Sequence, residues 1–268
     1  MLAALGFLTP FGPARAPSPA ALRWFPLVGA AAGAVVGLVW WAASKGWHGP
    51  LVPAALAVAA DLVVTGMLHV DGLADSADGL LPHLSRERRL EVMSQPDVGA
   101  FGMAATIAVL LLRVAALDAL RPDIALVVGV WCVSRSLVVV AMLVLPYARA
   151  TGGLATGDLA TGGPATGGPV TGGLATGGPA TGGLATAFLG GGVAGAALAA
   201  SVGVAAGTSL AVWAGGAPAG AGVGAAVVSV AALLWVARRR LGGFTGDVLG
   251  AAVVVSETAA LLVAGVRW

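Results

Sequence analysis

Long apolar runs that carry almost no charge constrain this chain more than any other feature of its sequence. Seven such runs follow one another along the chain: 25–43, 51–67, 101–120, 124–145, 188–213, 220–237 and 248–266. A helix needs roughly 20 consecutive apolar residues to cross a bilayer. We therefore predict an all-α fold, a polytopic integral membrane bundle of about six or seven transmembrane helices.

The composition excludes a water-soluble surface. Hydrophobic residues make up 58% of the 268 positions and charged residues 10%, and the mean hydropathy is +0.95. An ordinary soluble domain carries about 25% charged residues. The net charge is small, +2. We therefore expect a lipid bilayer around the protein and no nucleic-acid partner.

The distribution of basic residues predicts the orientation in the membrane. Cytoplasmic loops are enriched in Lys and Arg. If the N-terminus is cytoplasmic, nine basic loop residues share that side: Arg15, Arg23, Arg86, Arg88, Arg89, Arg149, Arg238, Arg239 and Arg240. Only Lys45, Arg121 and Arg267 lie on the other side. We therefore expect a multi-pass protein of the cell membrane whose N-terminus and active-site loops are cytoplasmic.

A low-complexity repeat interrupts the apolar pattern between the fourth and fifth runs. Residues 151–186 repeat the unit Thr-Gly-Gly-(Leu/Pro)-Ala with small variations. Gly and Pro disfavour a regular helix, and the segment has too little apolar bulk for a core. We expect a disordered Gly-rich loop without chemistry, inserted into a single membrane-embedded domain that spans residues 1–268.

Carboxylates gather in one short segment of a chain that otherwise tolerates little charge. Asp71, Asp75 and Asp78 are three of the 12 acidic residues, and His69 comes just before them. On a helix the three aspartates would share one face. Carboxylate oxygens are ligands that Mg²⁺ prefers, so we predict a magnesium site on Asp71, Asp75 and Asp78 and a catalytic role for these residues and His69. The alternative is a solvated turn built on Asp-Gly pairs.

A second polar segment follows the sixth apolar run. The residues that we predict to bind the substrate there are Arg238, Arg239, Arg240, Gly243, Thr245 and Asp247. The glycines free backbone N–H groups, and the N-terminus of a following helix favours anions. A short helix predicted within 85–95, with Ser85 as its cap, adds three arginines. These either hold phosphates or lipid head groups or merely mark the cytoplasmic side.

Charged residues also lie inside the apolar runs. Arg113, Arg135 and Glu257 lie within predicted spans, and Asp247 lies ten residues before Glu257. An ionisable group at membrane depth is costly unless it is paired or serves a function. Pairing of Arg with Glu or Asp inside the bundle is one interpretation of these residues.

Five short motifs occur in an order that resembles a known family. The segment 66–79, Gly-Met-Leu-His-Val-Asp-Gly-Leu-Ala-Asp-Ser-Ala-Asp-Gly, resembles the signature of the cobalamin synthase family, the adenosylcobinamide-GDP ribazoletransferases. The other four motifs lie at 23–29, 97–102, 146–149 and 242–251. The resemblance covers the chain except for the repeat, which takes the place of a short Gly-Leu stretch in the family.

The resemblance implies a defined reaction and its partners. The family joins adenosylcobinamide-GDP to α-ribazole, or to α-ribazole 5′-phosphate, and releases GMP. It requires Mg²⁺. The reaction is a phosphotransfer in which a ribose hydroxyl attacks a phosphorus within a pyrophosphate, so charge screening by metal and acidic residues fits it.

Two other functions remain open at the level of the sequence. A CDP-alcohol-type membrane phosphotransferase also uses intramembrane aspartates and a divalent metal, but it usually has Ala-Arg after the first Asp-Gly, where this chain has Leu-Ala-Asp. A transporter with an acidic ion site is the second alternative; the sequence has no inverted repeat with broken helices that would favour it. The oligomeric state is also open, a homo-oligomer included.

Overall fold

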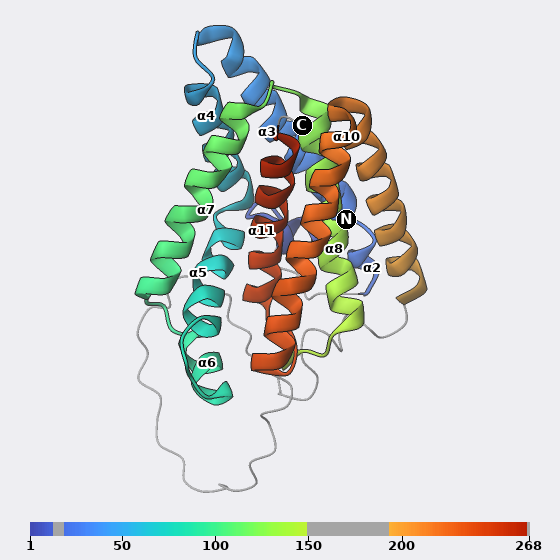
Figure 1. Ribbon diagram of the computed structural model, residues 1–268. Coiled ribbons are helices and arrows are strands. Elements are labelled where there is room, and N and C mark those ends of the chain that lie inside the picture. The colour runs from blue at the N-terminus through green and yellow to red at the C-terminus, as the bar shows by residue number, and fades with distance from the viewer. Residues whose placement is uncertain (13–18, 149–192, 267–268) are drawn as a thin grey trace, which may run out of the picture.

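The computed structural model describes residues 1–12, 19–148 and 193–266, and these residues form a bundle of helices (Figure 1). The helices are α1 (Leu2–Leu8), α2 (Pro19–Leu22), α3 (Phe25–Gly46), α4 (Leu51–Thr65), α5 (Leu68–Leu80), α6 (Arg86–Val92), α7 (Ala100–Ala119), α8 (Ile124–Val144), α10 (Val193–Leu241) and α11 (Gly246–Ala264). The described part contains one isolated β-bridge and no strand. The predicted all-α membrane bundle is confirmed, and the repeat at 151–186 lies outside the described residues.

Helix α10 consists of two arms that run side by side in opposite directions (Figure 1). A straight helix of its 49 residues would be about 74 Å long, more than twice the roughly 30 Å of a hydrocarbon core. The chain turns at Gly216, whose φ of 67° lies in the left-handed region, and Pro218 follows two residues later. The fifth and sixth predicted runs are these two arms.

The second apolar run is broken rather than straight. Helices α4 and α5 meet at an angle of 90°. Gly66 ends α4 in the left-handed conformation with φ 59°, and the N–H groups of Gly66 and Met67 bond back to Val63 and Leu62 at 3.2 and 2.9 Å. This pair of bonds is the Schellman motif. The acidic segment, which follows the break, is therefore a helix of its own.

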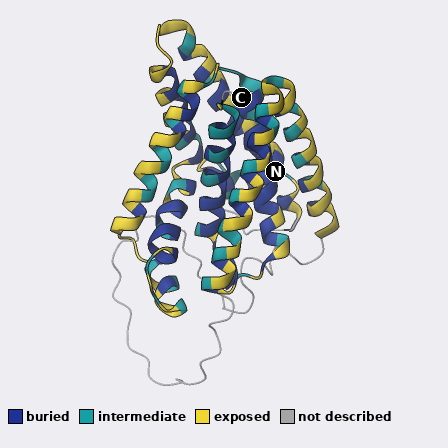
Figure 2. Ribbon diagram, in the orientation of Figure 1, coloured by how far each residue is buried: buried dark blue, intermediate teal, exposed yellow. Residues whose placement is uncertain are grey.

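Counting by length and hydropathy agrees with the predicted number of spans. Five described helices are long and apolar enough to cross a membrane, and the bent pair α4–α5 gives a sixth. Because one of the five is the two-armed α10, the two arms counted separately bring the total to seven. Large apolar side chains are exposed on the bundle, for example those of Phe101, Met103 and Leu111 on α7. Figure 2 shows that exposed residues recur along α7. Such a surface suits contact with lipid.

The N-terminal segment packs into the bundle. Ala4 and Leu8 of α1 are buried in a cluster that includes Phe25 and Phe244, and Phe7 stacks on Phe25 with 5.4 Å between ring centroids. Helix α1 is therefore part of the core, close to the start of α11.

Candidate active site

The aspartates of α5 form the centre of the candidate site. Asp71 is exposed and Asp75 is half-buried, and their spacing of four residues places them on one face of the helix. Asp71 lies nine residues from Leu80, so it stands about 14 Å along α5 from the end that faces α6. An exposed carboxylate so far along a span is very costly against lipid. This face of α5 is therefore expected to open to water.

Helix α11 packs tightly along α5 beside these carboxylates. A Cβ atom placed on Gly72 would lie 2.7 Å from the carbonyl oxygen of Asp247 and 3.2 Å from the Cα of Gly250. Only a residue without a side chain permits this approach. The hydroxyl of Thr245 caps α11 by accepting a hydrogen bond from the N–H of Val248 at 3.3 Å. The two predicted polar segments, 69–79 and 242–247, thus meet in the structure.

Asp78 has a different environment from the other two aspartates. Its carboxylate accepts hydrogen bonds from the backbone N–H groups of Gly99 at 2.7 Å and Gly102 at 2.9 Å. These groups belong to the N-terminus of α7, where a negative charge is stabilised by the helix dipole. Asp78 is only 8% exposed. Both of its oxygens therefore hold α7 against α5.

His69 does not join the aspartates on their face of α5. Two residues of a helix separated by one position point about 160° apart, and His69 is buried. Its Cα lies 3.3 Å from a Cβ placed on Gly250, on the side that packs against α11. The structure thus brings Asp71 and Asp75 together and places His69 on the opposite side.

Arginines bind the carbonyl groups where α5 ends. Arg89 donates to the carbonyl oxygens of Gly79 at 2.6 Å and Leu80 at 3.0 Å, and Arg240 donates to those of Leu80 and Leu81. The last carbonyls of a helix lack partners and carry partial negative charge. Burial, together with the neighbouring Arg240 guanidinium, lowers the pKa of Arg89. These two arginines stabilise the end of the site helix.

Arg86 has a similar role at the end of α10. It donates to the carbonyl oxygens of Leu241 and Ala148, both at 2.7 Å. Arg88 is exposed and pairs with Glu91 at 2.7 Å. The short helix α6 begins after Ser85, which caps it as predicted. Through its arginines α6 connects the ends of α5, α8 and α10.

Arg238 and Arg239 lie on another face of α10 from Arg240. Both are exposed, and the Arg239 guanidinium lies 5.0 Å from the ring centroid of Trp235. A surface hollow has these three side chains as its described lining. Ala237 and Leu241, which flank them in sequence, are fully buried. The predicted row of three substrate-binding arginines is therefore divided, with Arg240 directed at α5.

The loop between α10 and α11 is tied to the end of α8. The N–H of Phe244 bonds to the carbonyl of Pro146 at 3.0 Å, and the N–H of Ala148 bonds to the carbonyl of Phe244 at 2.8 Å. The rings of Tyr147 and Phe244 meet edge to face at 5.6 Å. Gly243, predicted to bind substrate, lies against the Pro146 carbonyl. The loop therefore has a defined position at the end of α8.

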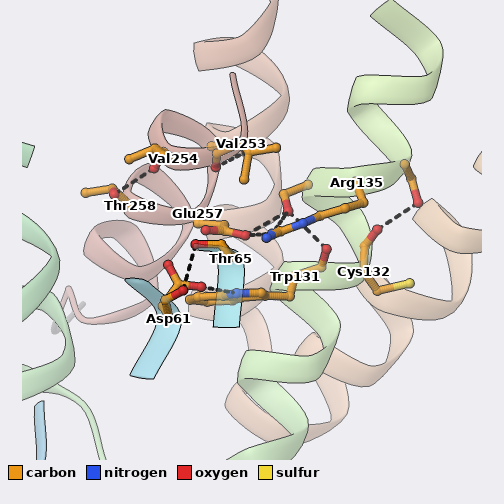
Figure 3. Close-up of polar contacts among 12 residues, drawn as sticks. Asp61, Thr65, Trp131, Cys132, Arg135, Val253, Val254, Glu257 and Thr258 are labelled. Carbon is orange, nitrogen blue, oxygen red and sulfur yellow. Dashed lines mark hydrogen bonds and ion pairs between the residues drawn. The ribbon is translucent and has the colours of Figure 1, made fainter. Parts of the chain in front are cut away.

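A network of buried charges lies deeper in the bundle (Figure 3). Arg113 pairs with Asp61 at 2.5 Å and with Glu257 at 2.9 Å. Glu257 also pairs with Arg135, and the indole N–H of Trp131 donates to Asp61 at 2.9 Å. The two positive and two negative charges cancel. The predicted Arg–Glu pairing is confirmed, and the aspartate that pairs with Arg113 is Asp61 rather than Asp247. The network links α4, α7, α8 and α11.

Asp71 and Asp75 fit a magnesium ion that takes only a few of its ligands from the protein. Within the described ranges, no three His, Cys, Asp or Glu side chains converge as a complete ligand set. Magnesium usually takes one or two carboxylates and keeps waters and substrate phosphates as its other ligands. Asp71 and Asp75 meet this requirement. Asp78 fits less well because both of its oxygens already accept backbone hydrogen bonds.

Comparison with known proteins shows the family to which the chain belongs. The family model of cobalamin-5-phosphate synthase matches residues 1–265. The chain belongs to this family. An adenosylcobinamide-GDP ribazoletransferase from Leptothrix cholodnii is 37% identical over 256 residues, which cover 91% of this chain and 83% of that relative. No solved structure matches the chain.

Other relatives of the same name align over a shorter stretch. The adenosylcobinamide-GDP ribazoletransferases of Chlorobaculum tepidum and Ralstonia nicotianae are each 39% identical over 137 residues. These alignments cover 50% and 49% of this chain and 53% of each relative. The membership predicted from the five motifs is confirmed.

The family motifs correspond to contacts in the structure. The motif at 97–102 supplies the N–H groups that hold Asp78, and the motif at 146–149 pairs with the loop at 242–247. The sequence did not reveal the helix-end roles of Arg86, Arg89 and Arg240, because their carbonyl partners are up to 160 residues away. The one local signal is the position of Arg240 in the last turn of its own helix, where basic residues often bind helix-end carbonyls.

Proposed function

We propose that this chain is an adenosylcobinamide-GDP ribazoletransferase. It joins adenosylcobinamide-GDP to α-ribazole, or to α-ribazole 5′-phosphate, and releases GMP with adenosylcobalamin or its 5′-phosphate. The observation that carries the proposal is the pair of accessible carboxylates, Asp71 and Asp75, in a helix that carries the signature of the family. Two relatives of that name support the choice of substrate.

Asp71 and Asp75 would hold the magnesium ion. The bound ion supplies charge neutralisation for the pyrophosphate and for the departing GMP. The residues of the chain then orient the reactants. A new bond forms between the ribose hydroxyl oxygen and the phosphorus attached to cobinamide, and the bond from that phosphorus to GMP breaks. The proton of the hydroxyl passes to a carboxylate of the α5 pair.

The start of α11 would bind the pyrophosphate beside these carboxylates. Thr245 and Asp247 lie there, and Gly72 of α5 packs directly on the backbone of Asp247. A helix N-terminus presents N–H groups to an anion. Arg240 would act through α5, since it donates to the carbonyls of Leu80 and Leu81. We place the end of the bundle that carries α6 in the cytoplasm of the cell, where nucleotides and Mg²⁺ are supplied.

A transfer assay tests this function. The full-length protein, purified and reconstituted in phosphatidylcholine vesicles, is given adenosylcobinamide-GDP, α-ribazole and Mg²⁺, and GMP and corrinoid products are measured. We expect equal amounts of GMP and adenosylcobalamin. A second reaction with a CDP-alcohol lipid and a free alcohol should yield no CMP; CMP release without GMP release would favour the lipid phosphotransferase instead.

A further inference from the structure

The accessible face of α5 changes from apolar to acidic along its length. Met67 immediately precedes α5, and Asp71 and Asp75 follow it at intervals of four residues. Leu68 is the first residue of α5. Met67 is 58% exposed and Leu68 is 40% exposed. The stripe from Met67 to Asp75 is about 12 Å long. Its apolar end is at the break with α4, and its acidic end is nearer to α6.

The N-terminal turn adds to the apolar end of this stripe. Pro10 packs on Gly66, where a Cβ atom would lie 2.8 Å from the proline ring. The next residue, Phe11, is 67% exposed. Segments far apart in the sequence thus meet at the break between α4 and α5. Phe11, Met67 and Leu68 are the exposed apolar residues next to this contact in the chain, and we call these three residues the shelf.

Met67 is held in a strained conformation at this point. Its φ of 61° is the only positive φ among the described non-glycine residues. The left-handed conformation costs an L-residue roughly 1–2 kcal/mol. Strain of this kind persists where the surroundings enforce it, and it is concentrated at sites that bind ligands. The break between α4 and α5 therefore holds Met67 in a fixed conformation despite this cost.

Lipid alone does not account for the shelf. Asp71 lies one helical turn from Met67 on the same face, and its N–H bonds to the Met67 carbonyl at 2.9 Å. Because an exposed carboxylate is expected to face water rather than lipid, the shelf borders the same water-accessible region as Asp71. An apolar surface next to a water-filled acidic site is suited to the apolar part of an amphipathic substrate.

We propose that the shelf binds the aromatic base of the ribazole acceptor. This inference rests on the proposed transfer reaction. A flat aromatic base can pack against the Phe11 ring and the Met67 thioether, while its ribose extends one turn along α5 toward Asp71 and Asp75. The corrinoid donor is a poorer match, because its ring is bordered by amide groups that need hydrogen-bond partners. The shelf side chains offer none. The shelf is therefore the specificity surface for the base.

Steady-state kinetics of the reconstituted full-length protein test this assignment. The variants are Phe11→Ala, Leu68→Asn and Met67→Gln, with Phe101→Ala and Met103→Gln on the exposed face of α7 as matched controls. We expect each shelf variant to raise the KM for α-ribazole about five- to tenfold, as loss of an aromatic or apolar contact does. The KM for adenosylcobinamide-GDP should not change. The controls should match the parent protein in both constants.

The other outcomes contradict the proposal. A raised KM for adenosylcobinamide-GDP would assign the shelf to the donor instead. Unchanged constants in all three variants would mean that this face contacts lipid. Met67→Leu keeps the apolar surface, so its KM for α-ribazole should stay within twofold of the parent value. If the parent protein released no GMP at all, the transfer function itself would be wrong, a result distinct from either of these.

Discussion

At the scale of single residues, the three aspartates of α5 are spaced along one helical face but have two different roles. Asp71 and Asp75 point to an accessible face, whereas Asp78 is buried and caps a neighbouring helix. Their common face was predictable from helical spacing. The division was not, because it depends on where the N-terminus of α7 lies, and that is a long-range contact. The same holds for Arg238 and Arg240, which differ only in the direction that they face around α10.

The first prediction concerns Asp78. Asp78→Ala removes the acceptor for the N–H groups of Gly99 and Gly102, so it should lower the free energy of unfolding by about 1–3 kcal/mol. Thermal unfolding in detergent measures this loss. Asp97→Ala, at an exposed aspartate of the loop before α7, is the control and should leave the midpoint unchanged. Equal midpoints for Asp78→Ala and the parent would show that the cap adds no stability.

A second prediction separates the arginines of α10. Arg240→Gln removes the charged donor at the carbonyls of Leu80 and Leu81. It should lower stability by about 1–3 kcal/mol and reduce the rate of GMP release, since the end of the site helix loosens. Arg238→Gln, an exposed position, should leave the unfolding midpoint unchanged. If the two variants lost stability equally, Arg240 would have no special role at the end of α5.

At the scale of elements, the broken span α4–α5 determines the geometry of the site. The sequence predicted an apolar run to residue 67 followed by a possible helix with three aspartates, and both are present. The 90° bend was not predictable, because an ordinary helix end and a sharp bend both use a glycine such as Gly66. In the structure Gly66 packs against Pro10, and this contact joins segments that lie far apart in sequence.

The break yields a third prediction. Gly66→Ala places a side chain at φ 59° and against the ring of Pro10. The left-handed strain alone should cost about 1–2 kcal/mol, so the unfolding midpoint should fall. Gly224→Ala, where a Cβ atom meets no other group within 4 Å, should keep or raise the midpoint because alanine favours a helix interior. A stable Gly66→Ala variant would mean that the bend does not need the left-handed residue.

At the scale of the whole molecule, the buried charges hold four helices around the site. Hydropathy predicted the number of spans, and the motifs predicted which loops meet. Neither indicated which charge pairs with which, since Asp61, Arg113, Arg135 and Glu257 come from four different helices. Pairing is nevertheless required physically, because a lone ion among apolar side chains would be expelled or neutralised.

A fourth prediction follows from the neutrality of this network. Glu257→Ala leaves Arg113 with one carboxylate partner, Asp61, and Arg135 without a carboxylate partner. It should therefore cost about 3–5 kcal/mol and reduce the yield of folded protein. Size-exclusion chromatography and thermal unfolding in detergent measure both effects. Glu91→Ala, which removes an exposed partner of Arg88, is the control and should change stability by less than about 1 kcal/mol. Equal behaviour of the two variants would contradict a structural role for the network.

The central claim is that the accessible carboxylates of α5 perform magnesium-dependent transfer to ribazole. The most direct measurement is GMP release from adenosylcobinamide-GDP and α-ribazole as a function of Mg²⁺ concentration, for the parent protein and for Asp75→Asn. We predict that chelation with EDTA abolishes release, that added Mg²⁺ restores it in the parent, and that folded Asp75→Asn remains inactive or needs far more Mg²⁺. Full release after chelation, or a parent-like magnesium dependence in Asp75→Asn, would contradict the claim.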